Sequence, residues 1–479
     1  MEFNGYTYLL FLAAAVCLFW AAPTKARRYI VLCLSLTFYA SWGLILVVLP
    51  VGISALTYIY ARMIVRWPEK RRAALWCGIG TVLAILAYFK YRVFLAGILG
   101  GVTGLSMGSV AGWWKGALPL GISFYSFEAV SYLLDVKNGR VKEIRFLDLL
   151  LFVMFWPHLL AGPIVRVREL VPQLGFNRKF EPTFLTAGLD RIVVGLVQKN
   201  VFANSLASWV DDGFMPKLAA TNTTIDTWTL AIAFGLQIYF DFAAYSNIAI
   251  GSAQLIGVTL PENFRTPYWA ANPSDFWARW HMTLSRWVRD YLFFPLNAKY
   301  RGKATVLYPS LIAVMGLVGL WHGAGWGFIL WGVLHGTYLV LYRLYEAQRG
   351  EALQAGRVRL VERLAVRVLT LVAVTAAWIA FRSSSLVQAG TLLGKMFGKL
   401  NLQISYSVNF YLVTALLMVY CAMEPLLGRG TSWLESKAEG SLRVRTGLDL
   451  MLRPLIYSIG FVLFLAFDSQ DTQFIYFQF

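Results

Sequence analysis

Long uncharged runs alternate with short charged segments along the whole chain. An α-helix needs about 20 apolar residues to cross a bilayer. Runs without Lys, Arg, Asp or Glu include residues 6–22, 29–61, 73–89, 149–165, 242–261, 304–342 and 400–423. Shorter apolar runs at 227–240, 368–381 and 454–467 are expected to be spans as well. The pattern predicts an all-α integral membrane protein with about 10–12 transmembrane or re-entrant helices.

Breaks in this pattern predict where the chain turns. Residues 29–61 are long enough for two short spans, and Pro50 and Gly52 predict the break between them. Residues 343–367 carry apolar side chains at helical spacing among charges, which predicts an interfacial or cytoplasmic helix. Residues 428–445 predict a mixed-charge loop.

The middle third of the chain is less uniformly apolar. Charge, Pro and Gly gather at residues 139–145, 166–179 and 261–303. At membrane depth such backbone is tolerated where it lines a protein-buried or watery cavity, which predicts re-entrant or short tilted helices around a central chamber. We expect one integral domain, with three parts in chain order: N-terminal helices at 1–115, a catalytic core at 116–345 and C-terminal helices at 346–479.

Composition supports lipid as the solvent of this chain. It has 479 residues, of which 58% are hydrophobic and 14% charged, against about 25% charged in a soluble domain. The net charge of +18 comes from basic clusters between the apolar runs. Short basic loops favour the cytoplasmic side, and anionic lipid headgroups are their expected partner, so nucleic-acid binding is disfavoured. The first run has no basic segment before it and predicts a first span rather than a cleaved signal.

The cysteines do not form a recognisable pattern. Cys17, Cys33, Cys77 and Cys421 are far apart and lie mostly in apolar runs. They predict small hydrophobic core residues, with neither a disulfide framework nor a metal site.

Two of the four histidines, His322 and His335, lie inside the uncharged run 304–342. An ionisable group at membrane depth is by default a candidate functional residue. Around His322, the sequence Trp321-His322-Gly323-Ala324-Gly325-Trp326-Gly327 is too rich in Gly for a helix interior, and lets a backbone or a ligand come close. Trp326 and Trp331 are expected to supply apolar walls. A neutral imidazole there can take a proton from a hydroxyl; the alternative is a helix-packing histidine bonded to a carbonyl.

A third histidine, His281, falls in a predicted helix over residues 274–292. Asn272-Pro273-Ser274-Asp275 is a helix start, with Ser274 or Asp275 as the expected cap. The residues that share the apolar face of this helix are Trp277, His281, Leu284, Val288 and Tyr291. His281 is therefore expected to be buried, as a catalytic or as a structural histidine. Arg279 and Arg289 are expected to bind an anionic group or to anchor the helix at the headgroups.

Asp241 is an acidic residue among aromatics, in Tyr239-Phe240-Asp241-Phe242. It either orients a catalytic base within a polar network or caps and links helices. The chain contains no G-x-S-x-G, H-E-x-x-H, P-loop or C-x-x-C motif, so the common signatures of other nucleophiles and metal sites are absent.

At these residues the chain resembles the membrane-bound O-acyltransferase family, and within it the bacterial branch of alginate O-acetyltransferases and D-alanyl transferases. The matching motifs are Phe38-Tyr39-Ala40, Tyr88-Phe89-Lys90-Tyr91, Leu118-Pro119-Leu120-Gly121, Phe155-Trp156-Pro157-His158, Gln237-Ile238-Tyr239-Phe240-Asp241-Phe242, Asp275-Phe276-Trp277-Ala278-Arg279-Trp280-His281, Trp321-His322-Gly323 and Phe474-Ile475-Tyr476-Phe477-Gln478-Phe479. One departure is Ala243-Ala244-Tyr245-Ser246-Asn247, where the family usually has Ser-Gly-Tyr-Ser-Asp.

The resemblance implies a ring of helices around a funnel or tunnel, in the inner membrane of a bacterium. It implies that an acetyl group moves from a cytoplasmic donor, acetyl-CoA, to an extracytoplasmic polysaccharide such as alginate, with no bound cofactor. His322 corresponds to the family's general base and His281 to its second histidine. The expected supporting or substrate-binding residues are His158, Arg166, Asp241, Arg279, Trp280, Trp321 and His335. The expected partners are the bilayer, a periplasmic or extracellular acetyltransferase and the polymer.

Two other functions fit parts of this pattern. One is transfer of D-alanyl or another acyl group to a cell-envelope polymer. The other is a transporter or flippase, which intramembrane histidines and broken helices would also suit. The chain lacks the inverted repeats and the relay of intramembrane carboxylates that favour a transporter.

Overall fold

The computed structural model describes residues 1–103, 119–298, 303–354, 360–441, 447–467 and 474–475. Helices supply the regular structure, and none of these residues forms a strand. The prediction of an all-α protein is confirmed. Parts of the sequence patterns discussed above lie outside the described residues, namely residues 104–118, 299–302, 355–359, 442–445 and 476–479.

The chain divides into two compact units. The first unit comprises Met1–Ile192 and Tyr245–Glu262, and the second unit comprises Val193–Ala244 and Asn263–Phe479. Two helices, α9 (Pro182–Val197) and α12 (Thr224–Leu255), contribute residues to both units. The three-part division expected from the sequence stays a prediction.

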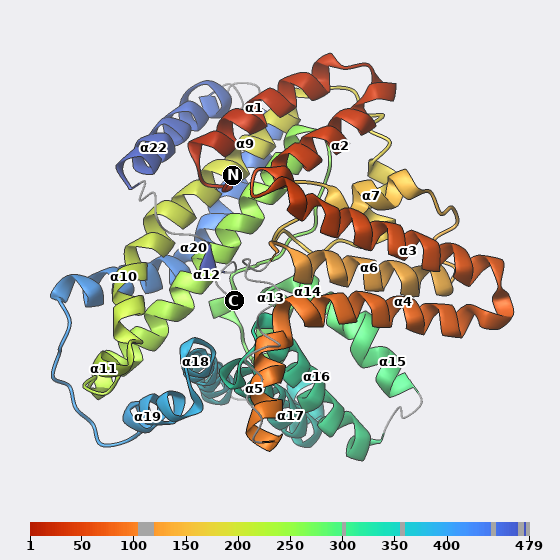
Figure 1. Ribbon diagram of the computed structural model, residues 1–479. Coiled ribbons are helices and arrows are strands. Elements are labelled where there is room, and N and C mark those ends of the chain that lie inside the picture. The colour runs from red at the N-terminus through yellow and green to blue at the C-terminus, as the bar shows by residue number, and fades with distance from the viewer. Residues whose placement is uncertain (104–118, 299–302, 355–359, 442–446, 468–473, 476–479) are drawn as a thin grey trace. The chain divides into compact units, whose positions relative to one another are not determined.

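Figure 1 shows the helices of each unit. Those of the first unit are α1 (Tyr6–Ala21), α2 (Thr24–Ala40), α3 (Val48–Arg66), α4 (Arg71–Leu86), α5 (Arg92–Thr103), α6 (Ile122–Lys137), α7 (Phe146–Met154) and α8 (Val167–Leu170). Those of the second unit are α10 (Asn204–Gly213), α11 (Pro216–Ala219), α13 (Pro273–Arg279), α14 (Met282–Val288), α15 (Phe294–Asn297), α16 (Ala304–His322), α17 (Trp326–Gln354), α18 (Leu360–Arg382), α19 (Leu386–Phe397), α20 (Val408–Gly440) and α22 (Arg453–Ala466). Short 3-10 or π segments lie at η1 (Leu44–Val47), η2 (Pro68–Lys70), η3 (Ala87–Tyr91), η5 (Val171–Gln173), η6 (Gln198–Ala203), η7 (Pro267–Trp269), η8 (Arg289–Phe293) and η10 (Leu448–Leu452).

Seven helices of the described residues are long and apolar enough to cross a membrane. They are Leu44–Arg66, Pro68–Gly100, Ala304–His322, Trp326–Arg349, Leu360–Arg382, Val408–Gly430 and Leu448–Ala466, with the shorter apolar helix Tyr6–Ala21 in addition. These seven are spans of the described residues, whereas the 10–12 helices expected from the sequence include re-entrant ones. The difference lies in the middle of the chain, where helices are short or carry buried polar side chains. The chain is a multi-pass membrane protein.

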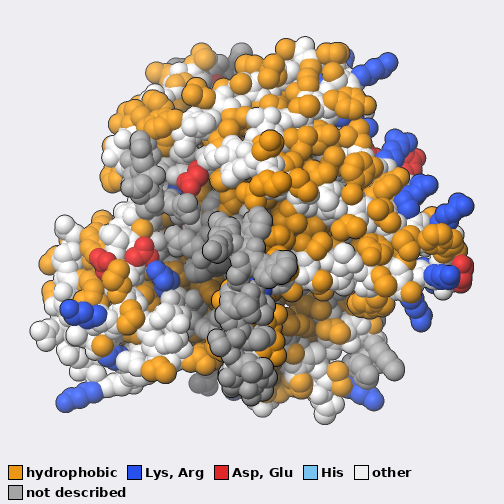
Figure 2. All heavy atoms as spheres, viewed as in Figure 1, with side chains coloured by type: hydrophobic (Ala, Val, Ile, Leu, Met, Phe, Trp, Pro, Cys, Tyr) orange, Lys and Arg blue, Asp and Glu red, His pale blue; other side chains and the backbone are white. Residues whose placement is uncertain are grey.

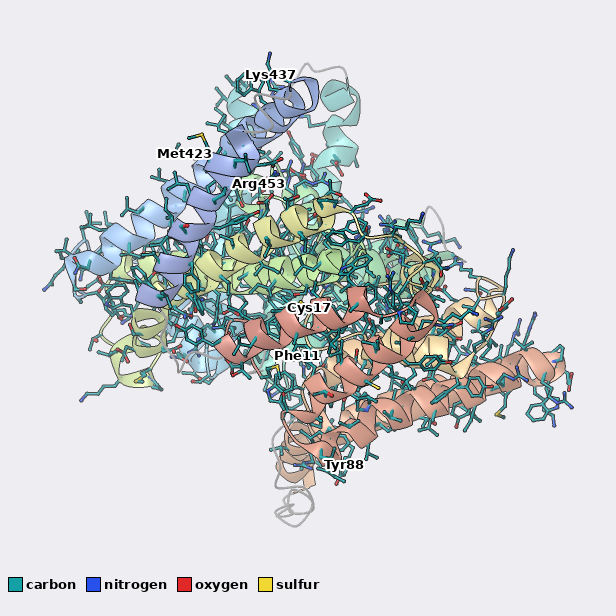
Figure 3. All side chains as sticks on the ribbon, turned by 90° about the horizontal axis from the view of Figure 1, so that it is seen from above. Phe11, Cys17, Tyr88, Met423, Lys437 and Arg453 are labelled. Atoms are coloured by element: carbon teal, nitrogen blue, oxygen red, sulfur yellow. The ribbon has the colours of Figure 1, made fainter. Side chains whose placement is uncertain are left out.

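Many apolar side chains face outward, as lipid contact requires. Hydrophobic side chains cover much of the face drawn in Figure 2. Met423 on α20 (Figure 3) is 47% exposed, and Cys17, Cys33 and Cys77 are exposed too. The prediction that the cysteines are core residues is therefore correct for Cys421 alone. In a membrane an apolar position can face lipid instead of the core, and sequence polarity does not distinguish the two.

Two predicted breaks are misplaced. In residues 29–61 the helices part at 41–47, and Pro50 sits inside the first turn of α3. A proline is tolerated there because its missing N–H is one that the first turn leaves unpaired anyway. The runs 227–240 and 242–261 were expected to be separate spans, yet α12 runs from Thr224 to Leu255 without interruption.

Three further segments differ from expectation. The run 149–165 is not a span: α7 ends at Met154, and residues 155–165 are non-helical and buried. Such backbone needs protein around it, as the prediction of re-entrant structure requires. Residues 343–354 continue α17 and residues 360–367 begin α18, so no separate helix forms among the described part of 343–367. Residues 428–440 are helical, because Leu, Lys, Glu and Ala are good helix formers outside the membrane too.

Candidate active site

The hairpin of α16 and α17 places two histidines in the second unit, and the two helices pack side by side (Figure 1). Glycines let their backbones come close. A Cβ atom at Gly319 would lie 2.1 Å from the carbonyl oxygen of Phe328, and one at Gly332 would lie 2.1 Å from that of Met315. These glycines therefore set the spacing of the hairpin.

His322 is the last residue of α16. Gly323 follows in extended conformation, and α17 begins three residues later at Trp326. Of the Gly-rich segment 321–327, residues 323–325 are non-helical, whereas its ends belong to α16 and α17. A Cβ atom at Gly323 would meet the Phe328 ring at 2.1 Å, whereas one at Gly325 would stay at 3.4 Å. The absence of a side chain at Gly323 is thus what lets Phe328 pack beside His322.

Aromatic rings surround the His322 imidazole. Its centroid lies 4.8 Å from the ring of Trp321, 5.1 Å from that of Trp331 and 5.4 Å from that of Phe381 on α18. All three contacts are edge-to-face. His322 itself is buried. The predicted wall residue Trp331 is confirmed in this position, but Trp326 is 53% exposed and forms no buried wall.

His335 lies further along α17 and shares one of these rings. The Trp331 centroid is 4.8 Å from the His335 ring, and Trp277 is 5.2 Å from it. His335 stacks on Phe276 at 5.9 Å with an interplanar angle of 14°. Its Nε2 is buried without a hydrogen-bond partner among the described residues. Trp331 thus lies between His322 and His335 and contacts both.

His281 sits at a break between two helices. The predicted helix 274–292 is wrong as one element, because α13 ends at Arg279 and α14 begins at Met282. His281 has φ 40 and ψ 53, a left-handed conformation that is uncommon for a residue with a Cβ. The cap of α13 is Asn272, whose side chain accepts from the Asp275 amide, rather than Ser274 or Asp275. An amphipathic period cannot reveal such a break.

Asn263 holds His281 in this position. His281 Nδ1 lies 2.9 Å from Asn263 Oδ1, which also accepts from Thr283 Oγ1 at 2.8 Å. The amide oxygen can only accept, so Nδ1 is the donor, and the lone pair of the neutral ring is on Nε2. His281 lies outside the seven candidate spans, and burial lowers its pKa to about 3. The imidazole is therefore neutral at pH 7.

The three histidines of the second unit belong to one continuous set of rings. His281 lies 6.3 Å from Trp321, which contacts His322 and so leads through Trp331 to His335. We call these five residues the histidine–tryptophan cluster. Trp378 of α18 borders it, with centroid distances of 5.8 Å to Trp331 and 5.1 Å to Trp280. The structure thus brings together the two motifs around His281 and His322. The sequence had indicated each motif separately, without predicting a contact between them.

Asp241 forms a buried ion pair. Lys199 Nζ lies 2.7 Å from Asp241 Oδ1, and both side chains are 2% exposed. The other carboxylate oxygen accepts from the Ile475 amide at 2.9 Å, and Lys199 Nζ lies 4.6 Å from the centre of the Phe474 ring. The next residue, Phe242, contacts the His281 ring at 4.6 Å. Asp241 therefore belongs to a buried polar network with Lys199 and the Ile475 backbone, and the choice between its two predicted roles stays a prediction.

Two of these residues were missed by sequence reasoning. A buried carboxylate needs a cation, so Asp241 should have prompted a search that reaches Lys199 in Val197-Gln198-Lys199-Asn200. Asn263 carries no comparable signal, because its role depends on the turn that brings it 2.9 Å from His281.

Arg279 is engaged within its own segment. Its Nε donates to Asp275 Oδ1 at 2.8 Å, and its Nη1 donates to Thr266 Oγ1 at 3.2 Å. Its backbone carbonyl accepts from the Arg265 amide. The side chain is 30% exposed, so it retains room for an anionic group. Arg289 pairs with Asp290.

His158 and Arg166 belong to the first unit. His158 Nδ1 lies 3.0 Å from Glu128 Oε1, with both side chains buried. A Cβ atom at Gly162 would lie 2.4 Å from the His158 Cα, which shows how tightly this non-helical segment turns. Arg166 begins α8 in a capping box with Glu169. Asn247, where the family has Asp, accepts from Arg191 Nη1 at 2.9 Å.

No group of three or more His, Cys, Asp or Glu side chains that could hold a metal was found among the described residues. These side chains are able to transfer protons in apolar surroundings. A neutral imidazole can remove a proton from a hydroxyl, and aromatic walls keep water out.

Several known proteins are similar to this chain over most of its length. The model of the membrane-bound O-acyltransferase family, MBOAT, matches residues 114–355. The chain is 36% identical to a probable alginate O-acetylase AlgI of Azotobacter vinelandii, over 83% of this chain and 78% of that protein. It is 33% identical to a probable alginate O-acetylase AlgI of Pseudomonas putida over the full length of both. It is also 33% identical to a peptidoglycan O-acetyltransferase of Helicobacter pylori, over 78% of this chain and 74% of that protein.

Proposed function

The chain belongs to the membrane-bound O-acyltransferase family and is an O-acyltransferase, and from this premise we propose that it O-acetylates an extracytoplasmic polysaccharide. The names of the relatives, alginate O-acetylases and a peptidoglycan O-acetyltransferase, support acetyl as the transferred group and a cell-envelope or secreted polysaccharide as the acceptor. We further propose that the membrane is the inner membrane of a bacterium.

His322 is the general base of this proposal. The observation that carries it is the position of His322 at the end of α16, where the chain leaves the helix and aromatic rings surround the imidazole. The imidazole accepts the proton of the acceptor hydroxyl while the hydroxyl oxygen attacks the carbonyl carbon of the thioester. The C–S bond then breaks, and the proton passes to the leaving sulfur. The acceptor gains an acetyl ester and the donor leaves as a thiol.

The other site residues are proposed to position this reaction. His281 is neutral and oriented by Asn263, so it can hold a hydroxyl or relay the proton. Trp321 and Trp280 exclude water from the reacting groups, and His335 supports Trp331 from its far side. Asp241, with Lys199, braces the helix that contacts His281. His158, through Glu128, and Arg166 are proposed to support the buried non-helical segment of the first unit that lies between them.

The donor is proposed to be acetyl-CoA arriving from the cytoplasm. The basic segments between spans, such as residues 343–367, favour the cytoplasmic side and suit phosphate groups. Arg279, with its 30% exposed side chain, is a candidate contact for the donor's anionic part. A separate periplasmic or extracellular acetyltransferase is the proposed partner that completes transfer to the polymer.

Acetyl transfer by purified protein in lipid vesicles tests the proposal. Radiolabelled acetyl-CoA is supplied to wild type, to His322→Ala and to Leu317→Ala, which removes a half-exposed side chain from the same helix. Wild type and Leu317→Ala should label acceptor, and His322→Ala should lose about 10²–10⁴-fold in rate with unchanged yield. Equal labelling by folded His322→Ala contradicts the base assignment. Transfer from a D-alanyl carrier but not from acetyl-CoA contradicts the acetyl donor.

A further inference from the structure

A cavity in the second unit lies outside the histidine–tryptophan cluster. It has a volume of about 430 Å³ and opens between α12, α18 and α20. Its wall is formed by Trp228, Ala231, Ile232, Gly235, Leu236, Tyr268, Trp269, Arg367, Leu371, Val372, Thr375, Trp378, Met418, Cys421 and Ala422. This volume is within the range of small-molecule sites, and the wall is nearly all apolar.

The polar groups of the wall are mostly used within the protein. The Trp269 indole N–H donates to the carbonyls of Cys421 and Ala422, at 3.0 and 3.1 Å. The Tyr268 hydroxyl donates to the carbonyl of Gly235. A ligand that filled this cavity would therefore find few hydrogen-bond partners. The cavity suits an apolar ligand such as a hydrocarbon chain better than a ligand rich in amides.

Arg367 is the one charged side chain among the described residues of this wall; besides it, the Trp378 indole nitrogen is also buried without a hydrogen-bond partner there. The guanidinium carbon of Arg367 lies 5.5 Å from the centre of the Trp269 ring. Its Nε is buried without a hydrogen-bond partner, and no carboxylate pairs with it among the described residues. A buried guanidinium nitrogen without an acceptor is costly, and a phosphate oxygen is the acceptor that arginine binds best.

The position of Arg367 along α18 indicates which end of the cavity lies at the lipid headgroups. Arg367, Leu371, Thr375 and Trp378 follow at four, four and three residues, which places them on one helix face. Trp378 is eleven positions after Arg367, which corresponds to about 16 Å along the helix axis. Arg367 immediately precedes the uncharged residues 368–381, so it sits where the span meets the headgroups. The segment that it ends is the basic one expected on the cytoplasmic side, where anionic lipids gather.

We propose that this cavity binds one anionic phospholipid, with its phosphate on Arg367 and an acyl chain extending toward Trp378. The occupant is a lipid because the cavity lies among candidate spans, has an apolar wall and offers one cation at its headgroup end. The acyl chain of the lipid would pack against Trp378, which contacts Trp331 and Trp280. Lipid occupancy is thereby coupled to the packing of the histidine–tryptophan cluster.

Lipid binding to the purified full chain tests this site. Detergent-solubilised protein is titrated with phosphatidylglycerol or phosphatidylcholine, and bound lipid is counted by native mass spectrometry. Wild type should bind one phosphatidylglycerol more tightly than phosphatidylcholine. Arg367→Gln should weaken the binding of phosphatidylglycerol about tenfold, and should remove the preference for phosphatidylglycerol over phosphatidylcholine. Arg66→Gln, an exposed basic residue of the first unit, is the matched control and should bind as wild type does.

A second variant separates the acyl chain from the phosphate. Leu371→Trp fills the cavity and leaves Arg367 in place, so it should lose lipid binding, whereas Leu371→Ala should keep it. Inorganic phosphate should compete weakly with the lipid in wild type. Equal binding by Arg367→Gln and Arg66→Gln overturns the headgroup assignment. Lipid binding that survives in folded Leu371→Trp, or that inorganic phosphate fully displaces, overturns the acyl-chain assignment.

Discussion

His158 of the first unit and His322 of the second unit are both buried, but their surroundings differ. His158 has a carboxylate partner, Glu128, at 3.0 Å. His322 lies among the rings of Trp321, Trp331 and Phe381, and within that cluster His281 has a neutral amide as its partner. A carboxylate stabilises the charged imidazolium, whereas aromatic and amide surroundings favour the neutral base. We therefore expect His158 to have a structural role, and the proposed proton transfer to depend on the histidines of the second unit.

The largest expected effect comes from separating these two roles. His158→Leu leaves Glu128 buried without a partner, and should lower the free energy of unfolding by about 3–5 kcal/mol. His322→Leu should lower it by less, because the leucine keeps apolar contacts with the surrounding rings. Unfolding in SDS measures both. The double variant His158→Leu/Glu128→Leu should recover most of the loss, and the comparison fails if His322→Leu destabilises as much as His158→Leu.

A carboxylate placed beside His281 would make it resemble His158. Asn263→Asp puts a negative charge at the Nδ1 of His281, which should raise its pKa from about 3 by about 1–3 units. Above the raised pKa the ring stays neutral and transfer is little changed. As pH falls through it, the ring takes up a proton and cannot accept another, so activity is lost.

The pH dependence of kcat/KM between pH 4 and 8 measures this change. Asn263→Asp should add an acid limb that wild type lacks in this range. Asn272→Asp is the matched control, since Asp caps a helix as well as Asn does and Asn272 caps α13. A profile for Asn263→Asp that coincides with that of Asn272→Asp would show that His281 takes no part in proton transfer.

The loop after His322 offers a smaller change. Gly323→Ala brings a Cβ atom to 2.1 Å from the Phe328 ring, so the ring or the end of α16 must move. We expect the free energy of unfolding to fall by about 1–3 kcal/mol and the rate of acetyl transfer to fall as well. Gly325→Ala, whose Cβ would lie 3.4 Å from the same ring, should behave as wild type. Indistinguishable thermal midpoints for the two variants would argue against tight packing beside His322.

Sequence patterns predicted the class of this protein and the residues worth testing, for identifiable reasons. Uncharged runs report lipid exposure, so the all-α membrane fold followed from them. The glycines after His322 predicted the helix end correctly, because conformational preference acts locally. The left-handed turn at His281 was missed, because it depends on Asn263 and Thr283 rather than on its own neighbours in the chain.

Pairing across the chain was the other limit of the sequence. Lys199 and Asp241 are 42 residues apart, and nothing local to either specifies the contact. The ring that joins His322 to His335 is Trp331, which sequence had placed as a wall without showing that it contacts both. Trp326 was assigned the same role, yet helix α17 turns it outward. Both residues are tryptophans with the same chemistry, and the packing of α17 decides that Trp331 is buried in the wall and Trp326 is not.

The smallest expected effect is at that outward tryptophan. Trp326→Leu replaces a side chain that is 53% exposed with another apolar one, so stability should stay within about 0.5 kcal/mol and transfer within about threefold of wild type. Trp331→Leu opens space between His322 and His335 and should cost stability by about 1–3 kcal/mol, with a clear loss of rate. Thermal midpoints and initial rates in vesicles measure both variants. If Trp326→Leu lost as much rate as Trp331→Leu, the wall of the site would extend beyond the buried rings to the lipid-facing end of α17, and substrate would approach His322 from that side.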